Sequence, residues 1–289
     1  MTRIILDLEW NGAYCKRVGG YFNEIIEIGA VKLSDDGTPP ARFDAYIRPV
    51  VSKKLTKLVQ NLTGITDEQV EDGISFAEAM KRLRRFAGDE PSVLMTWSNT
   101  DLLVLMENCR YFFDRQELPF FDYYLDLQHY AGGRVPFGDG QQVGLAKFAE
   151  AVGIDLTDRE LHHAIDDSVL SAEIFDRVYE KRSFDKAICP IDEEFYRRVT
   201  FRTTVISDIN NPLIRRGDLH FACDTCGHNL KRVGKWKFFH NMFSASFRCE
   251  ACDRTFTGRV QAKLKYEGVE VKKRLVYKEP KPQAEEVTP

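Results

Sequence analysis

The sequence predicts an α/β domain with a mixed sheet flanked by helices, followed by a small β-rich domain. In residues 1–184, apolar runs typical of strands come first, and patterns typical of helices follow and alternate with them. After residue 218, short strand-like segments and turns surround two pairs of cysteines. The chain has 289 residues, 43% of them hydrophobic, which is enough for one α/β core and an accessory module.

Three strands in antiparallel order are expected to open the first domain. Residues 3–8 and 24–33 are apolar runs, and residues 42–48 alternate apolar and polar side chains, as in a half-exposed strand. Residues 36–40, Asp-Gly-Thr-Pro-Pro, predict a hairpin turn before the third strand. A short buried strand is expected at 93–95. Helical patterns occupy residues 52–60, 75–88, 101–114, 143–152 and 165–182.

The remainder of the chain divides into three segments. Residues 185–217 are expected to form a connector, residues 218–278 the second domain, and residues 279–289, rich in Pro, Glu and Lys, a disordered tail. No apolar run approaches the roughly 20 residues of a membrane-spanning helix. The first nine residues contain Arg3, Asp7 and Glu9, so no signal peptide is expected. These features predict a cytoplasmic protein without membrane contact.

Carboxylates in three separate segments are the main candidates for chemistry. Asp7 and Glu9 follow an apolar run and, because strand side chains alternate, share one face at the end of a core strand. Acids in that position are costly unless they are paired or bound to a metal. Asp101 stands where strand 93–95 meets a helix, and Asp167 opens another helix.

These carboxylates, together with His162, suit two hard divalent cations and a general base, which is the equipment for hydrolysing a phosphodiester bond. Each feature taken alone has a simpler interpretation. Pairs such as Asp7 and Glu9 occur on exposed strands, an acid such as Asp101 stabilises a helix N-terminus, and His162 suits a surface loop.

The segments 6–12, 97–101 and 162–167 resemble the three motifs of the DEDDh 3′–5′ exonucleases. This ribonuclease-H-like group includes proofreading subunits of DNA polymerase and several exoribonucleases. Order and spacing agree over roughly residues 1–182, and the intervening segments 24–33 and 62–66 match as well. The resemblance implies a ribonuclease-H-like fold for the first domain.

The resemblance also implies roles for single residues. Asp7, Glu9 and Asp167 are expected to hold a first Mg²⁺ or Mn²⁺, with Asp7 bridging to a second ion that Asp101 holds largely through water. His162 resembles the general base, since it alone has Ala at plus two and Asp at plus five, whereas its neighbour His163 does not. The implied substrate contacts are Leu8, Trp10, Thr63, Gly64, Ile65 and Asn99, with Ile65 as a wedge beneath a base.

The residues after Glu9 depart from the family pattern. Many proofreading enzymes carry two small hydroxyl residues there, whereas this chain has Trp10 and Asn11. Trp10 offers either a stacking face for a base or a core aromatic beneath the motif. The segments 142–145 and 151–154 look closer to the RNA-trimming branch of the family, which slightly favours RNA over DNA as the substrate.

The cysteine pairs predict a structural zinc site. Cys223 and Cys226, and Cys249 and Cys252, form two C-x-x-C pairs separated by 22 residues. Two such pairs give four thiolates at tetrahedral Zn²⁺ distances and leave no open position for water. Two disulfides are the alternative and suit the cytosol poorly. The sequence around the two pairs resembles a zinc ribbon. His228 and His240 are further candidate ligands, which a site with four cysteines does not need.

A basic and aromatic strip lies between the cysteine pairs, within a C-terminal part that is basic as a whole. This part, residues 211–281, contains sixteen Lys or Arg and seven Asp or Glu, so its net charge is +9. Because the chain has a net charge of −3, the remainder carries −12. Cations interleaved with rings suit single-stranded nucleic acid, because charges hold phosphates and rings stack bases. Inward-packed aromatics and a docking surface for a protein partner are the alternatives. The strip residues are Lys231, Arg232, Lys235, Trp236 and Lys237.

The function that these observations favour is a metal-dependent 3′–5′ exonuclease that releases nucleoside 5′-monophosphates from single-stranded RNA or DNA. A DNA exonuclease of the proofreading or repair type is the nearest alternative. A non-catalytic nucleic-acid-binding adaptor is the alternative from another class, and incubation with a labelled oligonucleotide and Mn²⁺ distinguishes it. The sequence does not indicate an oligomeric state.

Overall fold

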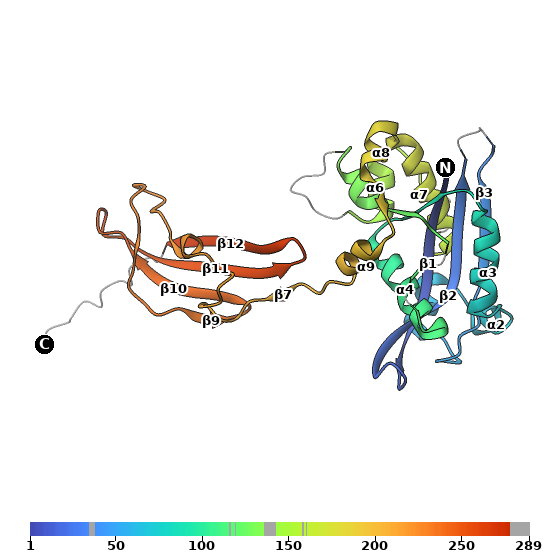
Figure 1. Cartoon of the computed structure of the whole chain (residues 1–289), viewed down its shortest axis with the longest axis horizontal. Coiled ribbons are helices and arrows are strands. Elements are labelled where there is room, and N and C mark those ends of the chain that lie inside the picture. Colours follow the sequence, from blue (N-terminus) through green and yellow to red (C-terminus); the bar gives the residue numbers. More distant parts are fainter. Residues whose placement is uncertain are drawn as a thin grey trace, which may run out of the picture. The chain divides into compact units, whose positions relative to one another are not determined.

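The computed structural model describes residues 1–34, 38–115, 117–118, 120–135, 143–157, 159 and 161–277. The chain forms two compact units, Met1–Val199 and Thr200–Pro289 (Figure 1). The tail expected at 279–289 lies outside the described residues, as does part of the turn expected at 36–40. None of the described helices is long and apolar enough to cross a membrane.

A six-stranded mixed sheet forms the centre of the first unit, in the order β3-β2-β1-β4-β5-β6. The first three strands are antiparallel, as the sequence predicts. Strands β4 and β5 run parallel to β1, and β6 is antiparallel to β5. The strands are β1 (Thr2–Cys15), β2 (Gly20–Leu33), β3 (Ala41–Tyr46), β4 (Ser92–Thr96), β5 (Tyr123–Asp126) and β6 (Cys189–Pro190).

Strand β1 is longer than the expected 3–8. After a bulge between Glu9 and Trp10 it continues to pair with β2 as far as Cys15. Asp7 and Glu9 therefore lie in mid-strand immediately before a bulge, not at the end of a strand. Bulges re-aim the side chains beside them and are frequent next to active sites.

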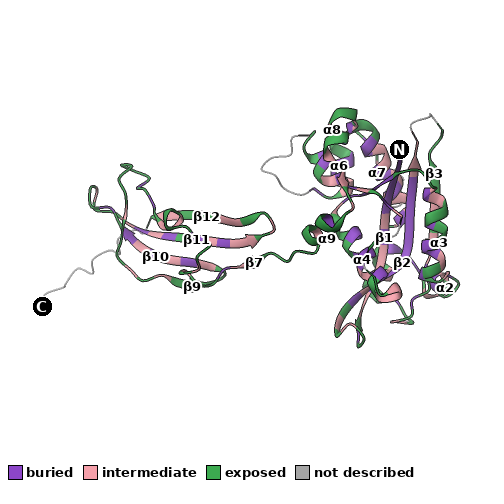
Figure 2. Cartoon of the chain, viewed as in Figure 1, coloured by how far each residue is buried: buried purple, intermediate pink, exposed green. Residues whose placement is uncertain are grey.

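Helices cover both faces of this sheet (Figure 2). Ile4, Leu6 and Leu8 of β1 pack on one face with α3 (Phe76–Ala87) and α4 (Asn99–Phe113). Ile5 packs on the opposite face, and because strand side chains alternate, Asp7 and Glu9 share that face. The helices of the second face are α5 (Leu127–Gly132), α6 (Leu145–Ala151), α7 (Ala164–Val178) and α8 (Lys181–Ala187).

Capping side chains explain where the helices differ from expectation. α1 (Lys57–Thr63) begins later than the expected residue 52, because the Thr56 hydroxyl accepts the Val59 N–H and sets the first turn. A short helix, α2 (Asp67–Glu71), follows. The helix expected at 165–182 is two helices, since Glu180 has an extended backbone and caps α8.

The expected connector, 185–217, is not a separate segment. Strand β6 extends the first sheet, and Phe195 of α9 (Glu193–Val199) is 2% exposed within the core of the first unit. Further on, β7 (Thr204–Val205) pairs with β11 (Thr255–Lys265), and Ile206 and Ile214 are buried in the core of the second unit. The boundary between the units therefore lies near residue 199.

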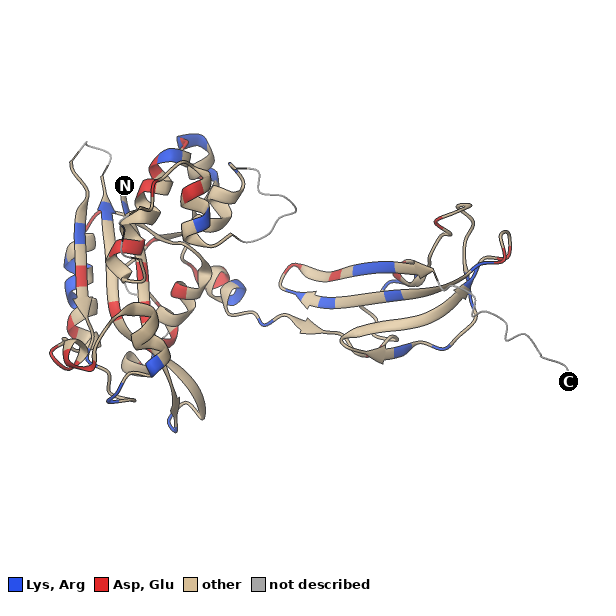
Figure 3. Cartoon of the chain, turned by 180° about the vertical axis from the view of Figure 1, so that it is seen from behind, with Lys and Arg blue, Asp and Glu red and all other residues tan. Residues whose placement is uncertain are grey.

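An antiparallel sheet forms the second unit, in the order β12-β11-β10-β8, with β9 beside β10 and β7 beside β11. Its core contains Phe221, Phe247, Phe256 and Val260. Lys and Arg recur along its long strands (Figure 3). The elements are η2 (Arg216–Leu219), a 3₁₀ turn, and β8 (Lys231–Arg232), β9 (Lys237–Phe239), β10 (Met242–Arg248), β11 (Thr255–Lys265) and β12 (Gly268–Tyr277).

Candidate active site and metal centres

The first unit gathers four carboxylates from three elements into one acid site. Asp7 and Glu9 of β1 and Asp167 from the first turn of α7 place ligand oxygens within 4.8 Å of one another. Asp101, in the first turn of α4, is 7% exposed and lies close enough to raise the pKa of Asp7. These are the four carboxylates that the sequence motifs single out.

Burial and mutual repulsion make these carboxylates reluctant to ionise. The pKa of Asp7 lies well above its usual range, because of burial first and then the charges of Asp101, Asp167 and Glu9. Burial and the charge of Glu27 raise the pKa of Glu9 to about 8. Burial likewise raises the pKa of Asp101 to about 7, against hydrogen bonds from its own N–H and that of Leu8. A hard divalent cation would relieve this repulsion, so the donor set fits Mg²⁺ or Mn²⁺.

A close contact between β2 and α7 places Asp167. A Cβ on Gly29 would lie 2.1 Å from the backbone carbon of Ala164, so only glycine allows the helix to start there. Glu27 Oε2 accepts the Ala164 N–H at 3.0 Å, and the Ser168 hydroxyl donates to Gly29 O at 3.0 Å. The first turn of α7 is thus fixed to the strand that pairs with β1.

The two histidines before α7 occupy different environments. His163 points to the buried carboxylate of Glu27, with 3.6 Å between Nδ1 and Oε1. His162 is exposed, and its backbone has a φ of +72°, which is rare for a residue other than glycine. Burial raises the pKa of Asp167, and the N–H and the charge of His162 oppose this rise. His162 therefore lies beside the acid site with an accessible ring, whereas His163 supports the helix.

Three of the residues that were expected to contact the substrate are buried. Ile65 is 1% exposed and packs with Ile26 and Val70, so its side chain is not a wedge beneath a base. Leu8 and Thr63 are also buried, at 2% and 4% exposure. Ile65 turns inward because the chain reverses at Gly64, where φ is +72°.

The remaining expected contacts lie at the surface or partly buried. Asn99 and Gly64 are exposed. Trp10 is partly buried and packs against the core of the first unit, which corresponds to the core-aromatic alternative for this residue.

The model of the RNase_T family, described as an exonuclease family, matches residues 4–175. The chain belongs to this family. It is a 3′–5′ exonuclease of the DEDDh type acting on nucleic acid, and its mixed sheet with flanking helices is the fold that the sequence predicts. The adaptor alternative is set aside by this assignment.

The exonuclease is similar to several known proteins. It is 33% identical over 185 residues to the probable 3′–5′ exonuclease KapD of Bacillus subtilis, covering 63% of this chain and 86% of that protein. It is 33% identical to the mouse ERI1 exoribonuclease 2 over 50% of this chain and 24% of that protein. A DNA polymerase III of PolC type from Staphylococcus haemolyticus is 30% identical over 30% of this chain and 6% of its own length.

The solved structures include a nuclease domain of similar fold. The nuclease domain of 3′hExo, a DEDDh family member bound to rAMP, superposes with a TM-score of 0.51 at 24% identity, covering 61% of this chain and 90% of that domain. That identity is low, so the similarity concerns the fold.

Sequence reasoning missed the buried polar residues that support the site. Glu27 and Gly29 fix α7, while Glu24 accepts the N–H groups of Val50 and Val51 at 2.7 and 2.9 Å. The only signal was two acids, Glu24 and Glu27, in an otherwise apolar strand of the exonuclease. Asn11 acts similarly, since its side-chain oxygen accepts the Thr56 N–H at 3.0 Å.

The second unit of the exonuclease brings four cysteines together. The sulfur atoms of Cys223, Cys226, Cys249 and Cys252 lie within 4.8 Å of one another. Cys223 Sγ is 3.6 Å from Cys252 Sγ, and Cys226 Sγ is 3.4 Å from Cys249 Sγ. Disulfides require about 2.05 Å, whereas tetrahedral zinc with bonds of about 2.3 Å separates sulfurs by roughly 3.8 Å. The group therefore fits a zinc ion.

Backbone N–H groups prepare these thiols for a cation. Burial opposes ionisation of Cys223, but N–H groups of Thr225 and Cys226 outweigh it and lower its pKa to about 6. The Cys252 N–H likewise lowers the pKa of Cys249. The first thiol of each pair therefore favours the thiolate form, the form that binds metal.

In the basic strip, one cation forms an ion pair and the other three are exposed. Lys231 Nζ lies 2.9 Å from Glu250 Oε1 in an exposed ion pair. Arg232, Lys235 and Lys237 are exposed, while Trp236 is partly buried. The ring of Trp236 lies 5.7 Å from that of Phe247, edge to face, so this aromatic is anchored in the core of the second unit.

Proposed function

We propose that this exonuclease is a metal-dependent enzyme that removes nucleoside 5′-monophosphates from the 3′ end of single-stranded nucleic acid, with RNA slightly favoured over DNA. The observation that carries the proposal is the group of Asp7, Glu9 and Asp167 within 4.8 Å, beside the buried Asp101. Carboxylates gathered in this way hold Mg²⁺ or Mn²⁺.

The residues divide the work in the proposed reaction. Asp7, Glu9 and Asp167 would hold one divalent cation, and Asp7 and Asp101 would help to hold a second. When bound, such cations would supply charge that stabilises the attacking and the leaving oxygen together. His162 accepts the proton of the attacking water, which a neutral imidazole does near neutral pH. The accessible ring of His162, beside the acid site, supports this role.

Two observations support the preference for RNA: the sequence of two segments and the kinds of relatives that the chain matches. The segments 142–145 and 151–154 look closer to RNA-trimming enzymes, and relatives of this chain include an exoribonuclease and a nuclease domain bound to rAMP. DNA is the second candidate substrate, because the match to a DNA polymerase III favours it.

The test is a digestion of matched single strands. RNA and DNA of the same base order, labelled at the 5′ end, are incubated with Mg²⁺ or Mn²⁺, and the products are identified by mass spectrometry. We expect a ladder that shortens from the 3′ end, nucleoside 5′-monophosphates as products, and faster loss of RNA. Products with a 3′-phosphate, or internal fragments at early times, would contradict the proposed reaction. Faster loss of DNA would reverse only the substrate preference.

We further propose that the protein works in the cytosol, a reducing compartment in which cysteines are available to bind metal. We also propose that the four cysteines hold one structural Zn²⁺. A closed site of four thiolates contributes folding free energy and no chemistry. The purified chain should contain one Zn per molecule by elemental analysis, retained under mild chelation that removes Mg²⁺. Loss of zinc in step with loss of Mg²⁺ would speak against a closed structural site.

A further inference from the structure

The second unit contains a pocket of about 670 Å³ that the acid site does not use. We infer that it binds one nucleotide of a single-stranded nucleic acid, with the base against Trp236 and the phosphates against Arg216 and Arg232. The inference rests on the proposed function in one respect, because the strand held there is taken to be the substrate of the exonuclease.

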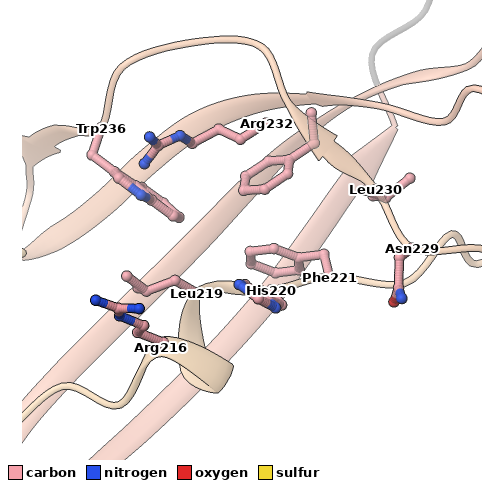
Figure 4. A pocket seen from close by; sticks show the side chains of 9 residues that line it. Arg216, Leu219, His220, Phe221, Asn229, Leu230, Arg232 and Trp236 are labelled. Carbon is pink, nitrogen blue, oxygen red and sulfur yellow. The ribbon is translucent and has the colours of Figure 1, made fainter.

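Aromatic rings form one part of the pocket. Phe221 and Phe247 are buried, with ring centroids 4.9 Å apart, and Trp236 meets Phe247 edge to face at 5.7 Å. Figure 4 shows Trp236 and Arg232 on one side of the pocket and Arg216 and Leu219 on the other. The partly exposed indole is thus held in place by buried rings and offers a stacking surface for a base.

Cations form the other part of the pocket. Arg216 comes from η2 and Arg232 from β8, and the Arg232 guanidinium lies 6.0 Å from the centre of the Trp236 ring. His220 adds an imidazole ring, and none of the lining residues is Asp or Glu. Within the described part of the chain neither arginine forms an ion pair, unlike the neighbouring Lys231, which pairs with Glu250. Such a lining favours an anionic ligand.

Both walls of the pocket are anchored to the sheet. Lys273 of β12 donates its ammonium group to the carbonyls of Gly217 and His220 and lies 5.0 Å from the centre of the Phe221 ring. On the other wall, the Val233 N–H donates to Ser246 O at 2.9 Å. The pocket is therefore formed before a ligand arrives, which lowers the entropic cost of binding.

The combination of groups favours a nucleotide over other anions. Small-molecule pockets measure roughly 300–1,000 Å³, so a volume of about 670 Å³ accommodates a base with its sugar and phosphate. An acidic peptide would satisfy the arginines but would leave the indole without a flat partner. Ring faces beside unpaired cations are how proteins bind single strands without reading their sequence.

The inference is tested by the affinity of the full chain for a short fluorescent single strand, measured by anisotropy. Asp7→Asn is present in every sample so that the strand is not cut. Trp236→Ala should weaken binding roughly tenfold or more, the worth of one stacked base, and Trp236→Phe should restore most of it. Arg216→Ala should weaken binding and reduce the slope of log affinity against log salt by about 0.7.

Lys235→Ala is the matched control, because Lys235 is an exposed cation of the same strip that does not line the pocket. We expect a clearly smaller effect from it than from Arg216→Ala. Trp236 packs against the core, so zinc content and melting temperature are measured for each variant, and Arg216, on the surface, tests the pocket if Trp236→Ala fails to fold.

Two results would overturn the inference. Unchanged binding in both Arg216→Ala and a folded Trp236→Ala would overturn the nucleotide assignment and would favour an acidic protein segment as the ligand of the pocket. Equal losses of affinity in Arg216→Ala and Lys235→Ala would show that binding depends on the overall positive charge of the surface and not on the pocket. Digestion of the same strand by the chain without Asp7→Asn is followed in parallel, so that failure of the pocket and failure of the proposed nuclease activity are recorded separately.

Discussion

Single carboxylates in the acid site are held where their charge is unfavourable. Burial and then the charges of Asp101, Asp167 and Glu9 raise the pKa of Asp7. Burial and the charge of Asp167 raise the pKa of Asp101, because buried like charges repel. The fold therefore supplies a site that a cation stabilises. The same repulsion makes the stability of the protein depend on pH and on metal.

Without divalent metal, the protein should become less stable as pH rises from about 4 to about 8. The folded-state pKa is raised to about 8 for Glu9 and about 7 for Asp101, whereas the unfolded chain titrates near pH 4. The contribution is complete below the unfolded values and is lost as pH rises through the folded ones. Added Mg²⁺ binds the ionised groups, so it should raise the melting temperature more at pH 8 than at pH 5. Equal increments at both pH values would contradict this account of the site.

Replacing His162 with glycine should change stability and activity in opposite directions. A positive φ costs a non-glycine residue roughly 1–2 kcal/mol, so His162→Gly should raise the melting temperature by a few degrees. The same change should lower the rate by roughly 10²–10⁴-fold, the usual contribution of a general base. His162→Ala should be equally slow without the gain in stability. A larger loss of rate from His163→Ala than from His162→Ala would show that the register of the third motif is wrong.

At the scale of elements, the contact between β2 and α7 decides whether the carboxylates meet. Asp167 reaches Asp7 only because α7 starts directly against Gly29, where no side chain fits. Glu27 and Ser168 add hydrogen bonds at the same point. The position of the helix is therefore part of the catalytic geometry.

Gly29→Ala should push α7 away from β2 and lower activity at least roughly 100-fold, since a displacement of about 1 Å at an active site costs that much. Gly20→Ala is the control: it lies on the same strand, and a Cβ there meets nothing within 4 Å. Activity is measured on a short single strand, and melting temperature monitors the fold. Near-normal activity in Gly29→Ala would show that α7 is not positioned by this contact.

The sequence predicted the parts of the fold that depend on local pattern. Alternation along β1 placed Asp7 and Glu9 on one face, and the helix that carries Asp167 was recognised from its own periodicity. The inward turn of Ile65 and the support from Glu27 were not predicted. Both depend on partners distant in the chain: Glu27 reaches Ala164 across 137 residues, and no local pattern encodes that pairing.

For the whole molecule, the division near residue 199 sets where the chain can be shortened. A chain that ends after Val199 keeps β6 and α9, including the buried Phe195, and should fold and cut short single strands. A chain that ends after Lys186 loses that aromatic, and removing a buried Phe side chain costs roughly 3–5 kcal/mol. Melting temperatures of the two chains provide the comparison. Equal stability would place the boundary at the earlier position that the sequence suggested.

The central claim is that the acid site around Asp7 is the metal-dependent active site. The most direct test compares the native chain with Asp7→Asn in the digestion of one 5′-labelled single strand in Mn²⁺. Asp7→Asn removes one charge at nearly constant volume and leaves the second unit unchanged. We expect the variant to retain its zinc and its fold but to lose cleavage and most of the stabilisation by Mn²⁺. Near-native cleavage by a folded Asp7→Asn chain would contradict the claim.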